Sequence, residues 1–151
     1  MPCNPSIGGT GKGQLVFEID ALGGEMGRAG DKVMLQDRML NSSKGAAVHS
    51  KRIQADRRLY QNIMKTTIEH TDNLSLVQAE IKEIRRNESD FTVVTMLGGL
   101  YTAKSVVVCT GTYLDSRVII GDYTCQSGLD GMHAAIGLTA SLEKMGIRMM
   151  R

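Results

Sequence analysis

The stretch CNPSIGGTGKGQL, residues 3–15, gathers residue types that could bind an anion or attack a substrate. Its four glycines allow close approach of a ligand to the backbone, and amides at the start of the predicted helix favour negative charge. A P-loop would need glycine at position 6 and serine or threonine at position 13, where this chain has Ser6 and Gly13. The spacing also differs from the dinucleotide fingerprint GxGxxG. The stretch therefore predicts a weak anion-binding turn, or glycines that only turn the chain.

Cys3 is the residue that we single out as a candidate nucleophile for covalent chemistry. A helix N-terminus and a nearby lysine favour the thiolate form of a cysteine and so raise its reactivity. The alternative is a small buried hydrophobic residue. We expect Cys109 to be structural within a buried strand and Cys125 to be a loop thiol. The three cysteines have no CxxC spacing, so neither a disulfide framework nor a metal site is predicted.

Positive charge is concentrated between Arg38 and Arg58, which enclose six basic residues and one acidic residue, a net charge of +5. The whole chain carries only +2. A basic loop that runs into a helix suits contact with phosphates. The candidate RNA-binding residues are Arg38, Lys44, Lys51 and Arg52. The alternative is a solvated helix face.

Helices and loops must position these groups in the first half of the chain. Leu15, Ile19, Leu22 and Met26 follow one another at steps of four, three and four and predict one face of a helix. We expect this helix to end at Gly23-Gly24 or to fray toward Gly27. Residues 28–50 lack periodicity and predict a long loop. Residues 51–70 predict a second helix, with apolar residues on one side and charges elsewhere.

The second half of the chain is richer in strand patterns. Residues 74–84 predict a strand, and residues 91–104 predict a hairpin closed by Gly98 and Gly99. The apolar run before Thr110 is typical of a strand buried on both faces in a parallel sheet. The tail predicts a helix from Gly131 to Lys144, stopped by Gly146.

The bulk properties are those of an ordinary globular chain. It has 151 residues, of which 42% are hydrophobic and 23% charged. There is no run of 18 apolar residues and no secretory pattern at the N-terminus. We therefore predict a cytoplasmic protein with no membrane partner.

Three long stretches closely resemble one family. They are CNPSIGGTGKGQLVFEIDALGGEMGRAGDK, RMLNSSKGAAVHSKRIQADRRLY and VVVCTGTYLDSRVIIGD, in order over almost the whole chain. They are similar to the GidA family, also called MnmG. The resemblance implies a flavoenzyme that uses FAD, reduced nicotinamide (NADH) and a folate one-carbon donor to modify C5 of the wobble uridine of tRNA. It also implies a GTPase partner of the MnmE type and a homodimer.

The resemblance implies an α/β fold: part of a Rossmann-like FAD-binding domain of the glutathione-reductase type, with a β-meander hairpin and an incomplete sheet. Residues 1–112 would belong to that domain, including the basic loop and helix, and residues 113–151 would begin an inserted or second domain. Cys3 would lie beside the flavin. Ile81 would contact the adenine end, although core packing is an alternative for it. The cofactor-binding positions would be Gly8, Gly9, Ile81, Thr110, Gly111 and Thr112.

The chain also departs from the family pattern. Family members begin earlier, with the GxGxxG segment, and continue for several hundred residues. We therefore expect an internal or truncated piece, inactive alone, with weak or absent FAD binding. Ala46, His49 and Ala135 replace the usual proline, arginine and serine. One alternative is a stand-alone RNA-binding module. Another is a fragment of a different flavoprotein of the disulfide-reductase type, but such proteins carry paired redox cysteines, which this chain lacks.

Overall fold

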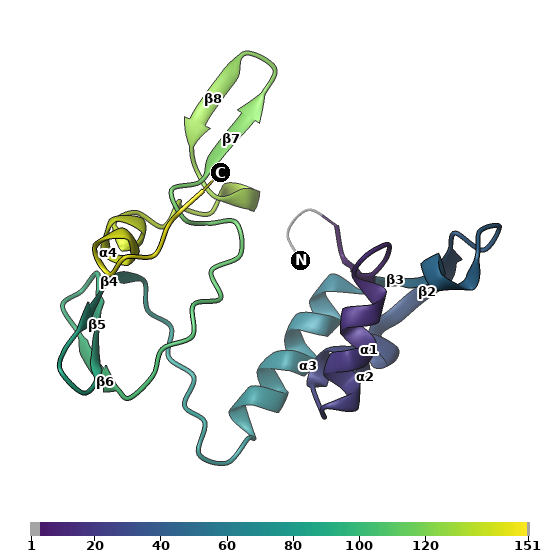
Figure 1. Cartoon of the computed structure of the whole chain (residues 1–151), viewed down its shortest axis with the longest axis horizontal. Helices are drawn as coiled ribbons and strands as arrows, with labels where there is room; N and C mark the ends of the chain where they lie inside the picture. Colours follow the sequence, from purple (N-terminus) through teal and green to yellow (C-terminus); the bar gives the residue numbers. More distant parts are fainter. Residues whose placement is uncertain (1–3, 151) are drawn as a thin grey trace. The chain divides into compact units, whose positions relative to one another are not determined.

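The computed structural model describes residues 4–150. The chain divides into two compact units, Met1–Leu76 and Val77–Arg151. Both combine helices with small sheets, so the predicted α/β class with an incomplete sheet is confirmed. Figure 1 shows the elements of both units.

The first unit is a three-stranded antiparallel sheet with three helices. The strand order is β1-β3-β2, so β3 is central and pairs with both neighbours. The elements are β1 (Ser6–Gly8), α1 (Gly13–Ala21), α2 (Glu25–Val33), β2 (Met34–Leu40), the 3-10 turn η1 (Ala46–Val48), β3 (Ser50–Ala55) and α3 (Arg57–Glu69).

Helices α1 and α2 pack on one face of this sheet because glycines let the backbones come close. A Cβ at Gly30 would lie 3.0 Å from the Cδ1 of Ile53 and 3.3 Å from that of Ile7. A Cβ at Gly27 would lie 2.8 Å from the Asp20 carboxylate of α1. The buried apolar residues of the unit form this contact layer: Ile7, Ala29, Val33, Ile53 and Ala55.

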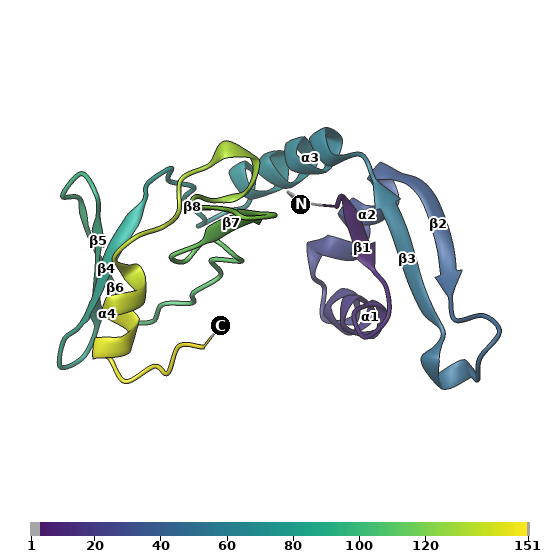
Figure 2. The same ribbon diagram turned by 90° about the horizontal axis from the view of Figure 1, so that it is seen from above.

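Strands β2 and β3 form a two-stranded ribbon that projects beyond α1 and α2, as both views show (Figure 2). Strand β2 is an edge strand and is exposed along almost its whole length. Side chains alternate between the two faces of a strand. The ribbon therefore has a helix-facing side, marked by Ile53, and an opposite side that carries Arg52 and Gln54.

Helix α3 begins directly after β3 because Asp56 caps it. The Asp56 carboxylate accepts a hydrogen bond of 2.9 Å from the backbone N–H of Leu59. This satisfies one of the donors that a helix N-terminus leaves unpaired.

The second unit has a three-stranded antiparallel meander in the order β4-β5-β6 and a separate hairpin, β7-β8. The apolar core is small: Ile84, Leu138 and Leu142 are buried where the last helix meets β4. The elements are β4 (Ile81–Arg86), β5 (Phe91–Thr95), β6 (Leu100–Ala103), β7 (Arg117–Ile120), β8 (Tyr123–Gln126), η2 (Leu129–Gly131) and α4 (Leu138–Lys144).

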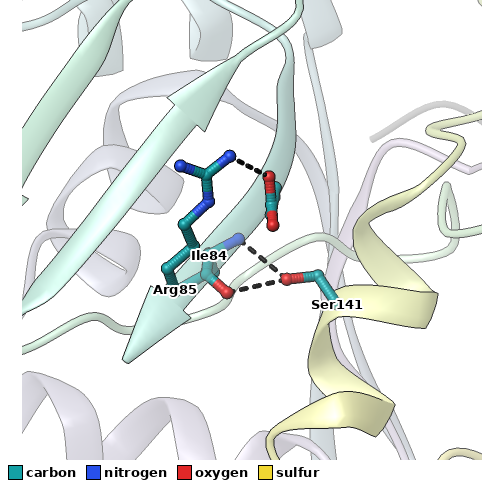
Figure 3. A network of polar contacts seen from close by, with 4 residues as sticks. Ile84, Arg85 and Ser141 are labelled. Atoms are coloured by element: carbon teal, nitrogen blue, oxygen red, sulfur yellow. Dashed lines mark hydrogen bonds and ion pairs between the residues drawn. The ribbon is translucent and has the colours of Figure 1, made fainter. Parts of the chain in front are cut away.

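The Ser141 hydroxyl joins α4 to the edge of β4 (Figure 3). It accepts a hydrogen bond from the backbone N–H of Ile84 and donates one to the carbonyl oxygen of the same residue, each at 2.8 Å. These two backbone groups point away from β5 and have no neighbouring strand to pair with, because β4 is an edge strand of the sheet. The helix thus covers an edge that would otherwise be open to another strand.

Several sequence predictions for the first unit were wrong. Residues 28–50 are not a long loop, because they hold the end of α2, strand β2 and η1. Residues 50–55 are not the start of a helix, because they form the central strand. The predicted helix at 15–26 ends at Ala21, and the helix predicted to reach residue 70 is confirmed from Arg57 onward.

In the second unit the predicted hairpin at Gly98 and Gly99 is confirmed by β5 and β6. The predicted strand at 74–84 begins only at Ile81. The run before Thr110 forms no strand, and Val107 is 84% exposed, so the prediction of a strand buried on both faces was wrong. The last helix covers only Leu138–Lys144, while Gly146 follows it with φ +87° as expected of a helix stop.

The two compact units of the structure meet between residues 76 and 77. The domain boundary expected between residues 112 and 113 stays a prediction. Among residues 4–150, no helix is long and apolar enough to cross a membrane.

Candidate functional site

The glycine turn between β1 and α1 is held together by its own backbone. The carbonyl oxygen of Gly9 accepts hydrogen bonds from the N–H groups of Lys12 (2.9 Å) and Gly13 (2.8 Å) and from the Ser50 hydroxyl. The N–H of Gly9 donates to the carbonyl of Lys51 at 2.8 Å. The N–H groups of Lys12 and Gly13 therefore bond within the chain, and the bonds of Gly9 to Ser50 and Lys51 attach the turn to β3.

The glycines of this turn do different things. Gly8 has φ +82°, and a Cβ there would lie 2.2 Å from the Lys51 carbonyl oxygen, so β3 itself requires glycine at this position. Gly9 has φ +99°. A Cβ built on Gly9 would lie 3.9 Å from the Cδ of Arg52 and 4.0 Å from the Cδ1 of Leu40. Gly9 therefore has room on the side of Arg52, whereas Gly8 has none. Their role in cofactor binding stays a prediction.

A cavity of about 220 Å³ lies on the helix-facing side of the sheet, between α1, α2 and the strands, and is lined by Gly8, Asp20, Asp31 and Lys51 among others. The Lys51 ammonium is 2.9 Å from the Asp37 carboxylate. The hydrogen bond and charge of Asp37, with a smaller contribution from Asp31, raise the pKa of Lys51. Lys51 is thus already paired within the chain.

The four predicted RNA-binding residues all lie on the β2–β3 ribbon or its tip, but not on one face. Arg38 and Arg52 are directly opposite each other in the register of the two strands. Together with Gln36, Leu40 and Gln54 they line a cavity of about 180 Å³. Lys51 projects from the other face, toward Asp37, and Lys44 lies in the tip before η1. RNA binding by this set stays a prediction.

The tip of the ribbon is fastened to the glycine turn by Asn41. Its side-chain amide donates to the Thr10 hydroxyl at 3.3 Å and to the carbonyl of Val48 at 3.1 Å. Asn41 has φ 58°, a conformation that asparagine tolerates better than most residues. Nearby, the His49 ring contacts the Lys44 carbonyl at 3.0 Å.

The Thr110-Gly111-Thr112 turn lies in the second unit. Gly111 and Thr112 line a cavity of about 740 Å³, together with residues of α4 such as Thr139 and Glu143. The Thr139 hydroxyl oxygen is buried and makes no hydrogen bond within the described part of the chain. A buried polar group without a partner is unusual in a folded protein. This hydroxyl is a polar group that sequence reasoning missed.

Ile81 begins β4 and packs against the core cluster of Ile84, Leu138 and Leu142, in agreement with the packing alternative. Its contact with adenine stays a prediction. The first unit thus holds Gly8 and Gly9, and the second holds the other predicted cofactor positions. Cys3, the predicted catalytic residue, lies outside the described residues.

The other two cysteines differ from expectation. Cys109 is exposed rather than buried, because the segment around it forms no strand. Cys125 is half-buried in β8 rather than in a loop, and its hydrogen bond raises the pKa of Tyr123. Among residues 4–150, no three His, Cys, Asp or Glu side chains are grouped closely enough to hold a metal ion.

Comparison with known proteins decides the family. The family model described as Glucose inhibited division protein A matches residues 1–151. The chain belongs to the GidA family. The GidA structure from Aquifex aeolicus, in its form II crystal, is 43% identical and superposes with a TM-score of 0.87, covering 98% of this chain and 25% of that one.

Curated relatives of this GidA-family chain carry one functional name. The "tRNA uridine 5-carboxymethylaminomethyl modification enzyme MnmG" of Finegoldia magna is 49% identical, and that of Caldicellulosiruptor saccharolyticus is 53% identical. Each match covers 100% of this chain and 24% of the relative. The chain therefore spans about a quarter of the length of the relatives that it matches.

Sequence reasoning found the arginines of the ribbon but missed Gln36 and Gln54 beside them. The alternation of Ser50, Arg52 and Gln54 with apolar Ile53 and Ala55 was a signal for a strand with one polar face.

Proposed function

We propose that this chain is part of an enzyme that modifies C5 of the wobble uridine of tRNA. The observation that carries the proposal is the match of the whole chain to relatives named for uridine modification, at 49% and 53% identity. The proposed chemistry uses FAD, NADH and a folate one-carbon donor, together with a GTPase partner of the MnmE type. Homodimerisation and a cytoplasmic location belong to the same proposal.

Each unit, taken by itself, holds groups whose chemistry suits part of a dinucleotide such as FAD. In the first unit, Gly9 lies beside the side chain of the cationic Arg52. In the second, Thr139 lines the same cavity as Gly111 and Thr112, and its hydroxyl oxygen is buried without a hydrogen bond in the described part of the chain. Cationic groups suit phosphates, and a buried hydroxyl suits the hydroxyl groups of ribose or ribityl. Bound flavin would supply the redox chemistry.

The ribbon residues Arg38, Lys44 and Arg52 would contact tRNA phosphates. Such contacts are electrostatic, so binding weakens as the salt concentration rises. Cys3 is proposed as the nucleophile or redox group near the flavin, as the resemblance implies.

A chimera tests the proposal directly. The segment of the Finegoldia magna enzyme that aligns with this chain would be replaced by residues 1–151, and wobble uridine modification would be measured by mass spectrometry of tRNA from cells lacking their own enzyme. We expect modification to be restored. A Cys3→Ala chimera serves as the matched variant and should bind flavin but fail to modify. A chimera that folds and binds flavin, yet leaves uridine unmodified, would contradict the proposal.

A stand-alone RNA-binding module is the second candidate, and the concentration of charge on the ribbon favours it. Electrophoretic retardation of unmodified tRNA by the full chain separates the two. Retardation that falls steeply with salt, together with an inactive chimera, would support the module instead.

A further inference from the structure

The bare face of the ribbon carries an ordered array of polar side chains. The strand register places Gln36 opposite Gln54 and Arg38 opposite Arg52. All four line the cavity of about 180 Å³, and Leu40 is the fifth lining residue. The donors of two guanidinium groups and two side-chain amides thus surround one small space.

Residues 4–150 supply no counter-charge to this face of the ribbon. Alternation along β2 places Asp37 on the opposite face, where it pairs with Lys51 at 2.9 Å. Within the described residues, neither Arg38 nor Arg52 has an ion pair or a side-chain hydrogen bond, and no acidic residue lines their cavity. Two like charges therefore face one space without a counter-charge.

Such an arrangement costs stability. Directly opposed side chains in an antiparallel pair have Cβ atoms about 5 Å apart, and like charges at that distance repel. An anion between the two guanidinium groups converts this repulsion into two charge-assisted interactions. Arginine also matches phosphate oxygens with paired N–H donors, which lysine cannot do.

We propose that Arg38 and Arg52 form a clamp for a single phosphate group, with Gln36 and Gln54 as flanking hydrogen-bond donors. The half-buried Arg52 passes beside Gly9, with its Cδ 3.9 Å from where a Cβ of Gly9 would stand, and Arg38 is exposed on the edge strand. The phosphate belongs to the backbone of RNA or to a dinucleotide. The RNA source rests on the proposed function, whereas the clamp itself rests only on the ribbon.

The test compares Arg38→Gln, Arg52→Gln and the double variant of the full chain. The matched control is the double variant Arg28→Gln/Arg86→Gln, which removes two arginine charges from exposed positions that are not part of strands β2 and β3. In one arm, retardation of unmodified tRNA is measured over a series of salt concentrations. In the other arm, FAD and NADH are titrated and followed by fluorescence. Circular dichroism spectra confirm that each variant is folded.

A clamp on one phosphate predicts strong coupling between the two arginines. Each single variant should weaken binding about tenfold to a hundredfold, and the double variant should be little weaker than either single variant. In the tRNA arm, the slope of log affinity against log salt should fall by about one unit, not two. The control should retain wild-type affinity in the arm that shows the effect.

The outcomes separate the clamp from the proposed function. If the variants bind both tRNA and the dinucleotides as tightly as the wild type does, the clamp is wrong. The proposed function is unaffected by that result. If only dinucleotide binding depends on the pair, the clamp stands and the tRNA contact at this face is wrong. Losses that add, or losses equal to those of the control, would also overturn the clamp, since they indicate a diffuse charge effect.

Discussion

The hydroxyl group of Ser141 bonds to both backbone groups of Ile84, 57 residues earlier in the chain, at 2.8 Å each. All three atoms are buried, so the bonds are not in competition with water. One side chain therefore satisfies an edge position of β4 and orients α4 over the small core of the second unit.

Ser141→Ala should destabilise the second unit by about 2 kcal/mol, because a buried N–H and a buried carbonyl would lose their partner. Urea denaturation followed by circular dichroism measures the change. Ser89→Ala, at an exposed position between β4 and β5, is the control and should change stability little. Equal stability of both variants would show that the bonds to Ile84 contribute nothing.

Gly8→Ala should destabilise the first unit more than Gly11→Ala does. Both glycines have positive φ, +82° and +70°, so both substitutions strain the backbone by about 1–2 kcal/mol. Only at Gly8 would the new methyl group meet a backbone oxygen at 2.2 Å, whereas nothing lies within 4 Å at Gly11. Thermal melting of the two variants compares them. A Gly11 variant that melts lower would refute the assigned role of Gly8.

Alkaline pH should weaken the first unit through Tyr60. Burial raises the pKa of Tyr60 above its usual value of 10.0, because the charged phenolate is disfavoured inside the fold. The stabilising contribution is therefore complete below pH 10 and is lost as the pH rises through the folded-state pKa. Tyr60→Phe should show a smaller loss of unfolding free energy between neutral and alkaline pH. Parallel curves for wild type and variant would rule out this source.

Self-association should depend on the apolar segment at 106–108. Val107 is 84% exposed, and within the described residues this segment pairs with no strand, so it can add to a strand of another molecule. Val107→Lys should lower the fraction of oligomer in sedimentation velocity runs. Leu97→Lys, at a residue that is 99% exposed in a hairpin turn, is the control. If both variants associate like wild type, another surface drives the assembly.

Sequence patterns predicted those helices and strands whose apolar residues recur at a regular spacing. They failed for segments whose secondary structure depends on pairing with strands that are distant in the sequence. Helix α3 was found because its apolar stripe is a local signal, whereas its start was placed too early because the cap at Asp56 was overlooked. Strand β2 was missed because an exposed edge strand shows no alternation of apolar and polar residues. Strand β3 was taken for helix because its pairing with two neighbours overrides local preference.

The same limit applies to the candidate site. Composition identified a basic segment, but only the register showed that Arg38 faces Arg52 while Lys51 turns toward Asp37. The unpaired Thr139 hydroxyl had no sequence signal, since its burial depends on where α4 packs. For Val107 the apolar pattern predicted burial, yet the described residues offer it no partner strand.

The Asn41 amide has a mechanical consequence. It joins Thr10 in the glycine turn to Val48 at the far end of the ribbon through two hydrogen bonds from one group. A force that bends the tip must therefore stretch one of these bonds or carry the turn with it. The tip of the ribbon and the glycine turn are thus tied together by a surface contact that is separate from the apolar core of the unit.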